Sequence, residues 1–282
     1  MCEFCHRHGE GQRWYLQARN YSEDLLTDLR RRRFIQDFVR DPEHLNEGVR
    51  RIERLKRLPP FVRRVVTPIV INRQKRVHYG QVVPMEEIER IFEFVNHVTR
   101  LPCICRQATL GTEQRYCYAV SIGPGAQSEL TETLRAADAS YLKGPDTSGL
   151  EALSTKEALV SIRELEKKGL CHTVWTFKTP FIGGICNCDR SDCLAMRLTV
   201  AMDYPVMFRA EYVAEVNPEL CSGCRQCMCA CQFGAIGFSV VREKAVIDPR
   251  RCYGCGICRS LCTRGAITLA ERSSVPLARG VW

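Results

Sequence analysis

The sequence of 282 residues lacks any apolar run close to the roughly 18 residues that a membrane-spanning helix needs. Its first residues are polar and contain no long apolar core of a secretion signal. It also lacks a Gly-x-Gly-x-x-Gly motif after a strand, a phosphate-binding loop and a nucleophile elbow. We therefore expect a cytoplasmic protein with no transmembrane segment, and no small-molecule substrate is evident.

Positive charge is concentrated in one part of the chain. Residues 30–76 contain 15 Lys and Arg against 5 Asp and Glu, whereas the whole chain has a net charge of only +9. Such a segment could be a solvated helix face, or it could bind nucleic acid, an anionic membrane or an acidic protein. No nucleic-acid module with stacking aromatics is visible, which argues against nucleic acid as a partner. Among the binding roles we favour a redox partner with an acidic surface facing residues 30–76.

Capping residues and apolar periodicity predict several helices before residue 170. Ser22 and Asp41-Pro42 are typical of helix starts in the basic segment. Pro84 opens a helix that we expect to continue through Val98, since Ile88, Ile91, Val95 and Val98 share one face. Ser154 to Glu157 form a capping box, and short strands are expected around residues 116–122. The fold class is therefore α+β, with a helix-rich N-terminal region.

Cysteine is abundant, with 18 residues, and its placement is regular in one region. The run Cys-x2-Cys-x2-Cys-x3-Cys occurs twice with an offset of 31 residues, and Gly234-Ala235-Ile236 recurs at the same offset as Gly265-Ala266-Ile267. A shared offset across cysteines, glycines and β-prone flanks indicates two copies of one supersecondary unit. The cysteines of the two runs are Cys221, Cys224, Cys227 and Cys231, then Cys252, Cys255, Cys258 and Cys262.

This duplicated run, within residues 212–269, resembles the bacterial two-[4Fe–4S] ferredoxins. Zinc knuckles and disulfides are the alternatives, but the third cysteine of each run fits zinc poorly. The resemblance implies a pseudo-twofold dicluster domain in which each cluster takes three ligands from one run and one from the other. One cluster would be held by Cys221, Cys224, Cys227 and Cys262, and the other by Cys252, Cys255, Cys258 and Cys231.

Two positions depart from that family, which usually has proline directly after the fourth cysteine. Gln232 and Thr263 stand there instead, and each restores a backbone N–H group. Cys229 is an additional thiol inside the first run, and we interpret it as a free cysteine. These departures affect the expected reduction potential rather than the ligands.

A second group of cysteines lies upstream. Cys103-x-Cys105 follows a predicted helix end, and Gly183-Gly184 precede the remaining members. The pairs place two sulfurs on one side of an extended segment, so a third Fe–S cluster or a zinc ion is a possible occupant, with reduced core thiols as the alternative. The candidate ligands are Cys103, Cys105, Cys186, Cys188 and Cys193.

The N-terminal segment offers a weaker candidate, since Cys2, Cys5, His6 and His8 could supply half of a metal site. Together with Leu101 to Arg106 and Ile185 to Asp189, this segment gives the whole chain a resemblance to long ferredoxin-type proteins of anaerobic bacteria. That resemblance implies no defined substrate.

These observations predict an electron-transfer protein or subunit that passes single electrons through two [4Fe–4S] clusters to a redox partner in anaerobic metabolism. We expect a basic helical segment at 1–80, an α+β cysteine-containing domain at 81–211 and a ferredoxin domain at 212–282. No catalytic residue is assigned. The alternative is an oxidoreductase in which a third, upstream cysteine-bound metal centre reacts with substrate.

Overall fold

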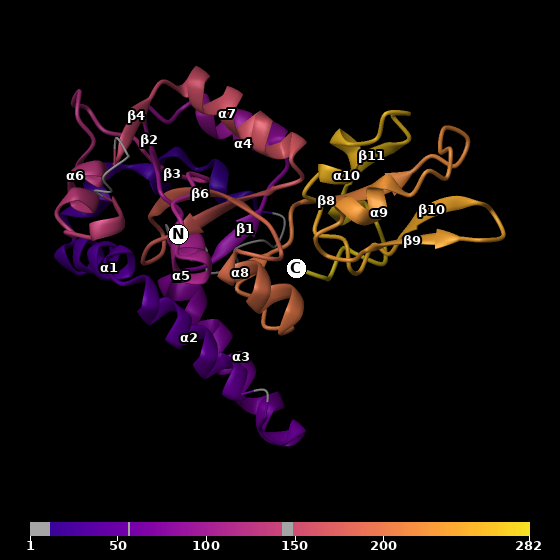
Figure 1. Ribbon diagram of the computed structural model, residues 1–282, viewed down its shortest axis with the longest axis horizontal. Helices are drawn as coiled ribbons and strands as arrows, with labels where there is room; N and C mark the ends of the chain where they lie inside the picture. The colour runs from indigo at the N-terminus through magenta and orange to yellow at the C-terminus, as the bar shows by residue number, and fades with distance from the viewer. Residues whose placement is uncertain (1–11, 56, 143–148) are drawn as a thin grey trace.

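The computed structural model describes residues 12–55, 57–142 and 149–282, and it confirms the predicted α+β class (Figure 1). Cys2, Cys5, His6 and His8 lie outside the described residues. A seven-stranded sheet carries helices on both faces, and two small two-stranded sheets form the C-terminal part. Within the described ranges, none of the helices is both long and apolar enough to span a bilayer.

The large sheet has the strand order β4-β2-β3-β6-β5-β1-β7 and is antiparallel except where β1 pairs with β7. Its strands are β1 (Gly80–Val82), β2 (His97–Leu101), β3 (Cys117–Ser121), β4 (Glu151–Leu153), β5 (Cys171–Thr176), β6 (Ile182–Cys188) and β7 (Met207–Phe208). Because alternate side chains of a strand point to opposite faces, the central strands supply two separate cores.

One face of this sheet packs under α4 (Met85–Phe92) and α7 (Thr155–Lys167) (Figure 1). Tyr118 and Val120 of β3 point into that core, together with Ile88 of α4 and Ile162 of α7. The opposite face is covered by α5 (Ile104–Leu110), α6 (Glu129–Arg135) and α8 (Leu194–Met196) with the π-helical turn Arg197–Ala201. This second face is the one that carries the upstream cysteines.

The predicted helix from Pro84 through Val98 is too long. The helix α4 ends at Phe92, and Val98 belongs to β2. Val95 and Val98 are nevertheless buried, since a turn and a strand return the chain to the same core. The side chain of Asn96 stabilises that turn, because it donates to the carbonyl of Gly123 (2.7 Å) and accepts from the amide of Gly123 (3.1 Å).

The basic segment forms α1 (Leu29–Arg40), α2 (Pro42–Leu55) and α3 (Pro60–Val77), which extend away from the C-terminal sheets (Figure 1). Ser22 caps the 3₁₀ helix Glu23–Thr27 rather than α1, whose cap is Asp28. The helix α2 packs against α5. The predicted capping box of α7 is confirmed, because Ser154 and Glu157 exchange hydrogen bonds.

The C-terminal part pairs the ends of the duplicated unit crosswise. Strand β8 (Tyr212–Val216), which opens the first copy, pairs with β11 (Ile267–Glu271), which closes the second. Strand β9 (Ile236–Ser239) closes the first copy and pairs with β10 (Lys244–Ile247) of the second. Two short helices, α9 (Gln226–Ala230) and α10 (Ile257–Ser260), lie against each other. The repeat therefore folds as one interlocked module.

A buried carboxylate connects the N-terminal segment to the sheet. Glu23 is only 4% exposed, and its Oε1 accepts hydrogen bonds from the hydroxyls of Ser121 and Ser128 (both 2.7 Å) and the amide of Leu130 (3.3 Å). Burial alone would raise the pKa of Glu23, but the hydrogen bonds from Ser128, Ser121 and the backbone lower it below 4.5. The ionised form is thus preferred in the folded protein.

Glu23→Gln is expected to lower the free energy of unfolding at pH 7 by about 1–3 kcal/mol, because a charge-assisted network becomes neutral. A carboxyl with a depressed folded pKa contributes stability above its unfolded pKa, near 4.5, and that stability is lost as pH falls through the folded pKa. The difference from wild type should therefore shrink between about pH 5 and pH 3. Urea unfolding followed by circular dichroism checks this, with exposed Glu93→Gln as control. A difference independent of pH would contradict it.

Candidate metal centres

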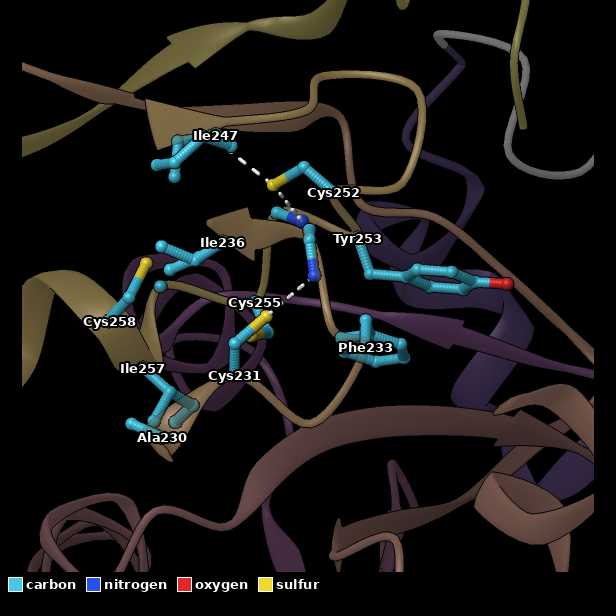
Figure 2. A pocket seen from close by; sticks show the side chains of 14 residues that line it. Ala230, Cys231, Phe233, Ile236, Ile247, Cys252, Tyr253, Cys255, Ile257 and Cys258 are labelled. Atoms are coloured by element: carbon cyan, nitrogen blue, oxygen red, sulfur yellow. Dashed lines mark hydrogen bonds between the residues drawn. The ribbon is translucent and has the colours of Figure 1, made fainter. Parts of the chain in front are cut away.

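The eight cysteines of the duplicated runs surround two small hollows, four to each. Cys231, Cys252, Cys255 and Cys258 line the first hollow, which Figure 2 shows from close by. Cys221, Cys224, Cys227 and Cys262 line the second. Each set combines three cysteines of one run with the fourth cysteine of the other, as the ferredoxin resemblance implies. The two hollows have similar empty volumes, about 340 and 390 Å³, with the open solvent at their mouths included.

The two halves of the module use equivalent backbone donors. The amide of Ala235 donates to Sγ of Cys231 (3.3 Å), and 31 residues later the amide of Ala266 donates to Sγ of Cys262 (3.4 Å). The amides of Ala214 and Gly254 donate to Sγ of Cys252 at 3.4 and 3.3 Å. Amides that point at ligand sulfurs stabilise negative charge there and help set a cluster's potential. The donor set therefore fits anionic iron–sulfur clusters.

Glycines allow the ligand loops to pass close to neighbouring strands. Gly223 (φ +72°) and Gly254 (φ +69°) lie in the left-handed region that favours glycine. A Cβ atom at Gly254 would be 2.0 Å from the carbonyl oxygen of Tyr212, and one at Gly223 would be 2.4 Å from that of Glu243. The two glycines are 31 residues apart, so both copies of the repeat contain this close backbone contact as well as the cysteines.

The two quartets differ in their access to solvent. Cys224 is exposed, whereas Cys252 and Cys258 are buried. Burial raises the pKa of the Cys252 and Cys258 thiols. Since thiols must lose their protons to become ligands, these two residues would need a bound metal to be deprotonated at neutral pH. The quartet with Cys224 faces the surface, and the quartet with Cys258 faces the rest of the protein.

This geometry defines an iron–sulfur electron-transfer module. Residues 214–263 match the family model of the 4Fe-4S dicluster domain, and the chain therefore carries a dicluster ferredoxin module in its C-terminal part. None of the curated proteins compared with the chain matches it.

Polar contacts attach the module to the large sheet. Gln232, at the position that proline usually takes in the family, accepts from the amide of Arg190 (3.0 Å) and donates to the carbonyl of Gly169 (3.0 Å). The hydroxyl of Ser260 on α10 donates to Glu166 of α7 (2.7 Å). The side chain of Gln232, directly after the candidate ligand Cys231, thus connects this part of the module to two loops of the sheet.

The structure brings all five upstream candidates together on one face of the large sheet. Cys103 caps α5, Cys105 lies within it, Cys186 and Cys188 lie on β6, and Cys193 caps α8. Two further cysteines join them. Cys117 is the register partner of Cys186, and Cys171 is the register partner of Cys188. Neither is among the ligands predicted from the sequence, although Cys117 lies only 12 residues after Cys105.

Among the described residues, no three or more His, Cys, Asp and Glu side chains are arranged to hold a metal ion as they stand. The two ferredoxin quartets are included in that result, because ligands of a multi-iron cluster surround a wider space than the ligands of one ion.

Proposed function

We propose that this chain is an electron-transfer protein, or the electron-transfer subunit of an oxidoreductase, with two [4Fe–4S] clusters. Cys221, Cys224, Cys227 and Cys262 would hold cluster 1, and Cys252, Cys255, Cys258 and Cys231 would hold cluster 2. The observation that supports this most directly is the exchange of the fourth cysteine between two equivalent hollows. When bound, such clusters supply one-electron chemistry with no substrate of their own.

The residues around the clusters define two ends of the module. Near cluster 1, Cys224 is exposed, as are Leu220 (46%), Val240 (80%) and Val241 (96%). Exposed apolar side chains beside an accessible cluster suit a short-lived protein contact. Near cluster 2, Phe233 and Tyr253 stack at 4.0 Å and exclude water from the inner side. We propose that a redox partner exchanges electrons at the cluster 1 end.

The basic segment would then serve a different contact. Figure 1 shows α1 to the left of the large sheet and α2 and α3 below it, away from the β9–β10 hairpin at the right. A partner with an acidic surface facing residues 30–76 would approach the upstream cysteines, since α2 packs against α5. We further propose a cytoplasmic setting in anaerobic metabolism, with residues 212–282 as the ferredoxin domain, 81–211 as the cysteine-containing domain and 1–80 as the basic segment.

Iron analysis of anaerobically purified protein tests this proposal. Cys258→Ser is expected to lower the iron content by about four atoms per chain, because a cubane loses one of its four cysteine ligands. Cys224→Ser should have a similar effect on cluster 1. The matched control is Cys229→Ser, since Cys229 is exposed and lines neither hollow. Retention of all iron in both ligand variants, or zinc in place of iron in the wild type, would refute the two-cluster function.

A further inference from the structure

The seven upstream thiols described above gather on one face of the large sheet for a geometric reason. Cys117 of β3 pairs with Cys186 of β6, and Cys188 lies two residues further along the same strand. Residues two apart in a strand point to the same face, so all three side chains face α5 and α8. The helices α5 and α8 lie over this face, and they place Cys103, Cys105 and Cys193 against it.

Six of these thiols form a continuous set of contacts. Sγ of Cys193 is 3.2 Å from Sγ of Cys188, and the Cys193 thiol also interacts with the Cys105 thiol. The thiols of Cys105 and Cys117 both interact with that of Cys103. Cys117 in turn interacts with its register partner Cys186, so that the set extends from β6 through both helices and back. We call Cys103, Cys105, Cys117, Cys186, Cys188 and Cys193 the six-cysteine cluster.

A buried arginine adjoins this cluster. Arg106 is 1% exposed, and its Nη1 lies 3.6 Å from Sγ of Cys103. Nη2 forms an ion pair with Asp189, but Nε is buried and has no hydrogen-bond partner among the described residues. A guanidinium and one carboxylate are charge-balanced, yet an unpaired donor at this depth costs free energy unless another acceptor is present. Thiolates with bridging sulfides are acceptors of this kind.

Packed reduced thiols are the simpler explanation of a buried cysteine cluster. They account for burial, but they leave the donor of Arg106 unpaired and require no cation beside them. A single zinc ion binds four ligands, so it would leave two of the six thiols without a role and would supply no sulfide. An anionic iron–sulfur centre supplies bridging sulfides, which can accept a hydrogen bond from Arg106.

We propose that the six-cysteine cluster supplies the ligands of a third iron–sulfur centre, and that this centre exchanges electrons with cluster 2 next to Cys171. The inference rests on the proposed function for cluster 2 and assigns its inner electron partner. In each exchange one centre is oxidised by one electron as the other is reduced by one, so no further reactant is needed.

Cys171 supports the connection because it touches both sides. Its thiol donates to the carbonyl of His172 (3.7 Å), and it lies close enough to Cys255, a proposed ligand of cluster 2, and to Cys193 and Cys231 to interact electrostatically. It is fully buried, and its register partner is Cys188 of the six-cysteine cluster. The same apolar core contains Cys171, Cys188, Cys193, Cys231 and Cys255. The two centres would therefore be neighbours with no intervening solvent.

The test compares anaerobically purified wild type with the double variant Cys186→Ser/Cys188→Ser. The variant is expected to lose roughly two irons per chain for a [2Fe–2S] centre or four for a [4Fe–4S] centre, while the iron removed by Cys258→Ser is unchanged. Cys229→Ser is again the control. Equal iron in wild type and double variant, or loss of zinc instead, overturns the third centre and leaves the two-cluster function intact. If the iron content of Cys258→Ser equals that of the wild type, the proposed function is wrong instead.

Electron paramagnetic resonance tests the connection to cluster 2 separately. Two neighbouring paramagnetic centres broaden each other's signals, so the third centre's signal in the fully reduced wild type should narrow in Cys258→Ser, which removes cluster 2. Cys224→Ser, which removes the more distant cluster 1, should narrow it less. Should the two variants give the same line width as wild type, the third centre is isolated and the proposed exchange is wrong. Circular dichroism confirms that each variant is folded.

Discussion

Gly254→Ala is expected to lower the free energy of unfolding of the iron-loaded protein by about 3 kcal/mol or more, and to prevent complete loading of cluster 2. A left-handed φ costs an L-residue about 1–2 kcal/mol. The greater part comes from the 2.0 Å approach of the new Cβ atom to the carbonyl oxygen of Tyr212, since that oxygen belongs to a paired strand and cannot move freely. Denaturant unfolding and iron analysis under anaerobic conditions measure both effects.

Gly265→Ala separates the two causes. Gly265 has φ +60°, close to that of Gly254, but an added Cβ atom would have no neighbour within 4 Å. This control should lose only about 1 kcal/mol and keep its iron. Gly223→Ala, with its 2.4 Å approach to Glu243, should behave like Gly254→Ala at cluster 1. If Gly254→Ala and Gly265→Ala were equally stable, steric contact would not be the reason for glycine in the ligand loop.

Arg272→Met is expected to destabilise the protein by about 3–5 kcal/mol, through carbonyl groups left without a donor. The side chain of Arg272 is fully buried and donates to the carbonyls of Ala210 (2.7 Å), Tyr212 (2.9 Å) and Cys252 (2.8 Å). Burial lowers the pKa of Arg272 to about 10, so the guanidinium stays charged at neutral pH. It therefore links β8, the ligand loop of cluster 2 and the chain after β11.

The loss should appear as a lower denaturation midpoint together with faster loss of iron from cluster 2, because Cys252 is one of its proposed ligands. Arg250→Met is the matched control, since Arg250 is exposed and only its backbone amide makes a hydrogen bond. The free energy of unfolding of this control should stay within about 0.5 kcal/mol of that of the wild type. A similar loss in both variants would show that total charge, not the three carbonyl contacts, accounts for the effect.

The ferredoxin module could be predicted from sequence because its information is local. Each ligand run fits within 11 residues, and its repetition at a constant offset identifies the strands that flank it. The class of fold and the dicluster module are confirmed. The ligand sets remain predictions, although the structure gathers the same cysteines around each hollow.

The full grouping of the upstream cysteines could not be predicted from short segments of the sequence. Cys103 and Cys105, and Cys186 and Cys188, are close enough in sequence to be predicted as pairs. Cys117 joins them only through the register of β3 against β6, and Cys171 only through the register of β5 against β6. Register depends on the whole sheet, so no short segment reveals it.

The excess length of the helix predicted from Pro84 has the same kind of cause. Apolar spacing marks which residues face the core, but a turn followed by a strand can bury Val95 and Val98 equally well. The hydrogen bonds that Asn96 makes with Gly123, 27 residues away, favour the turn. A contact between such distant residues is not visible in helical periodicity.

Gln232 and Ser260 have a consequence for how electrons can be delivered. Many redox domains are attached by a flexible linker and move between a donor and an acceptor. In this chain, side chains on both halves of the module instead form hydrogen bonds with Gly169, Arg190 and Glu166. The distance between the cluster 2 loop and β5 is therefore held constant. A partner that exchanges electrons at the cluster 1 end would therefore meet a module whose position relative to the sheet is already set.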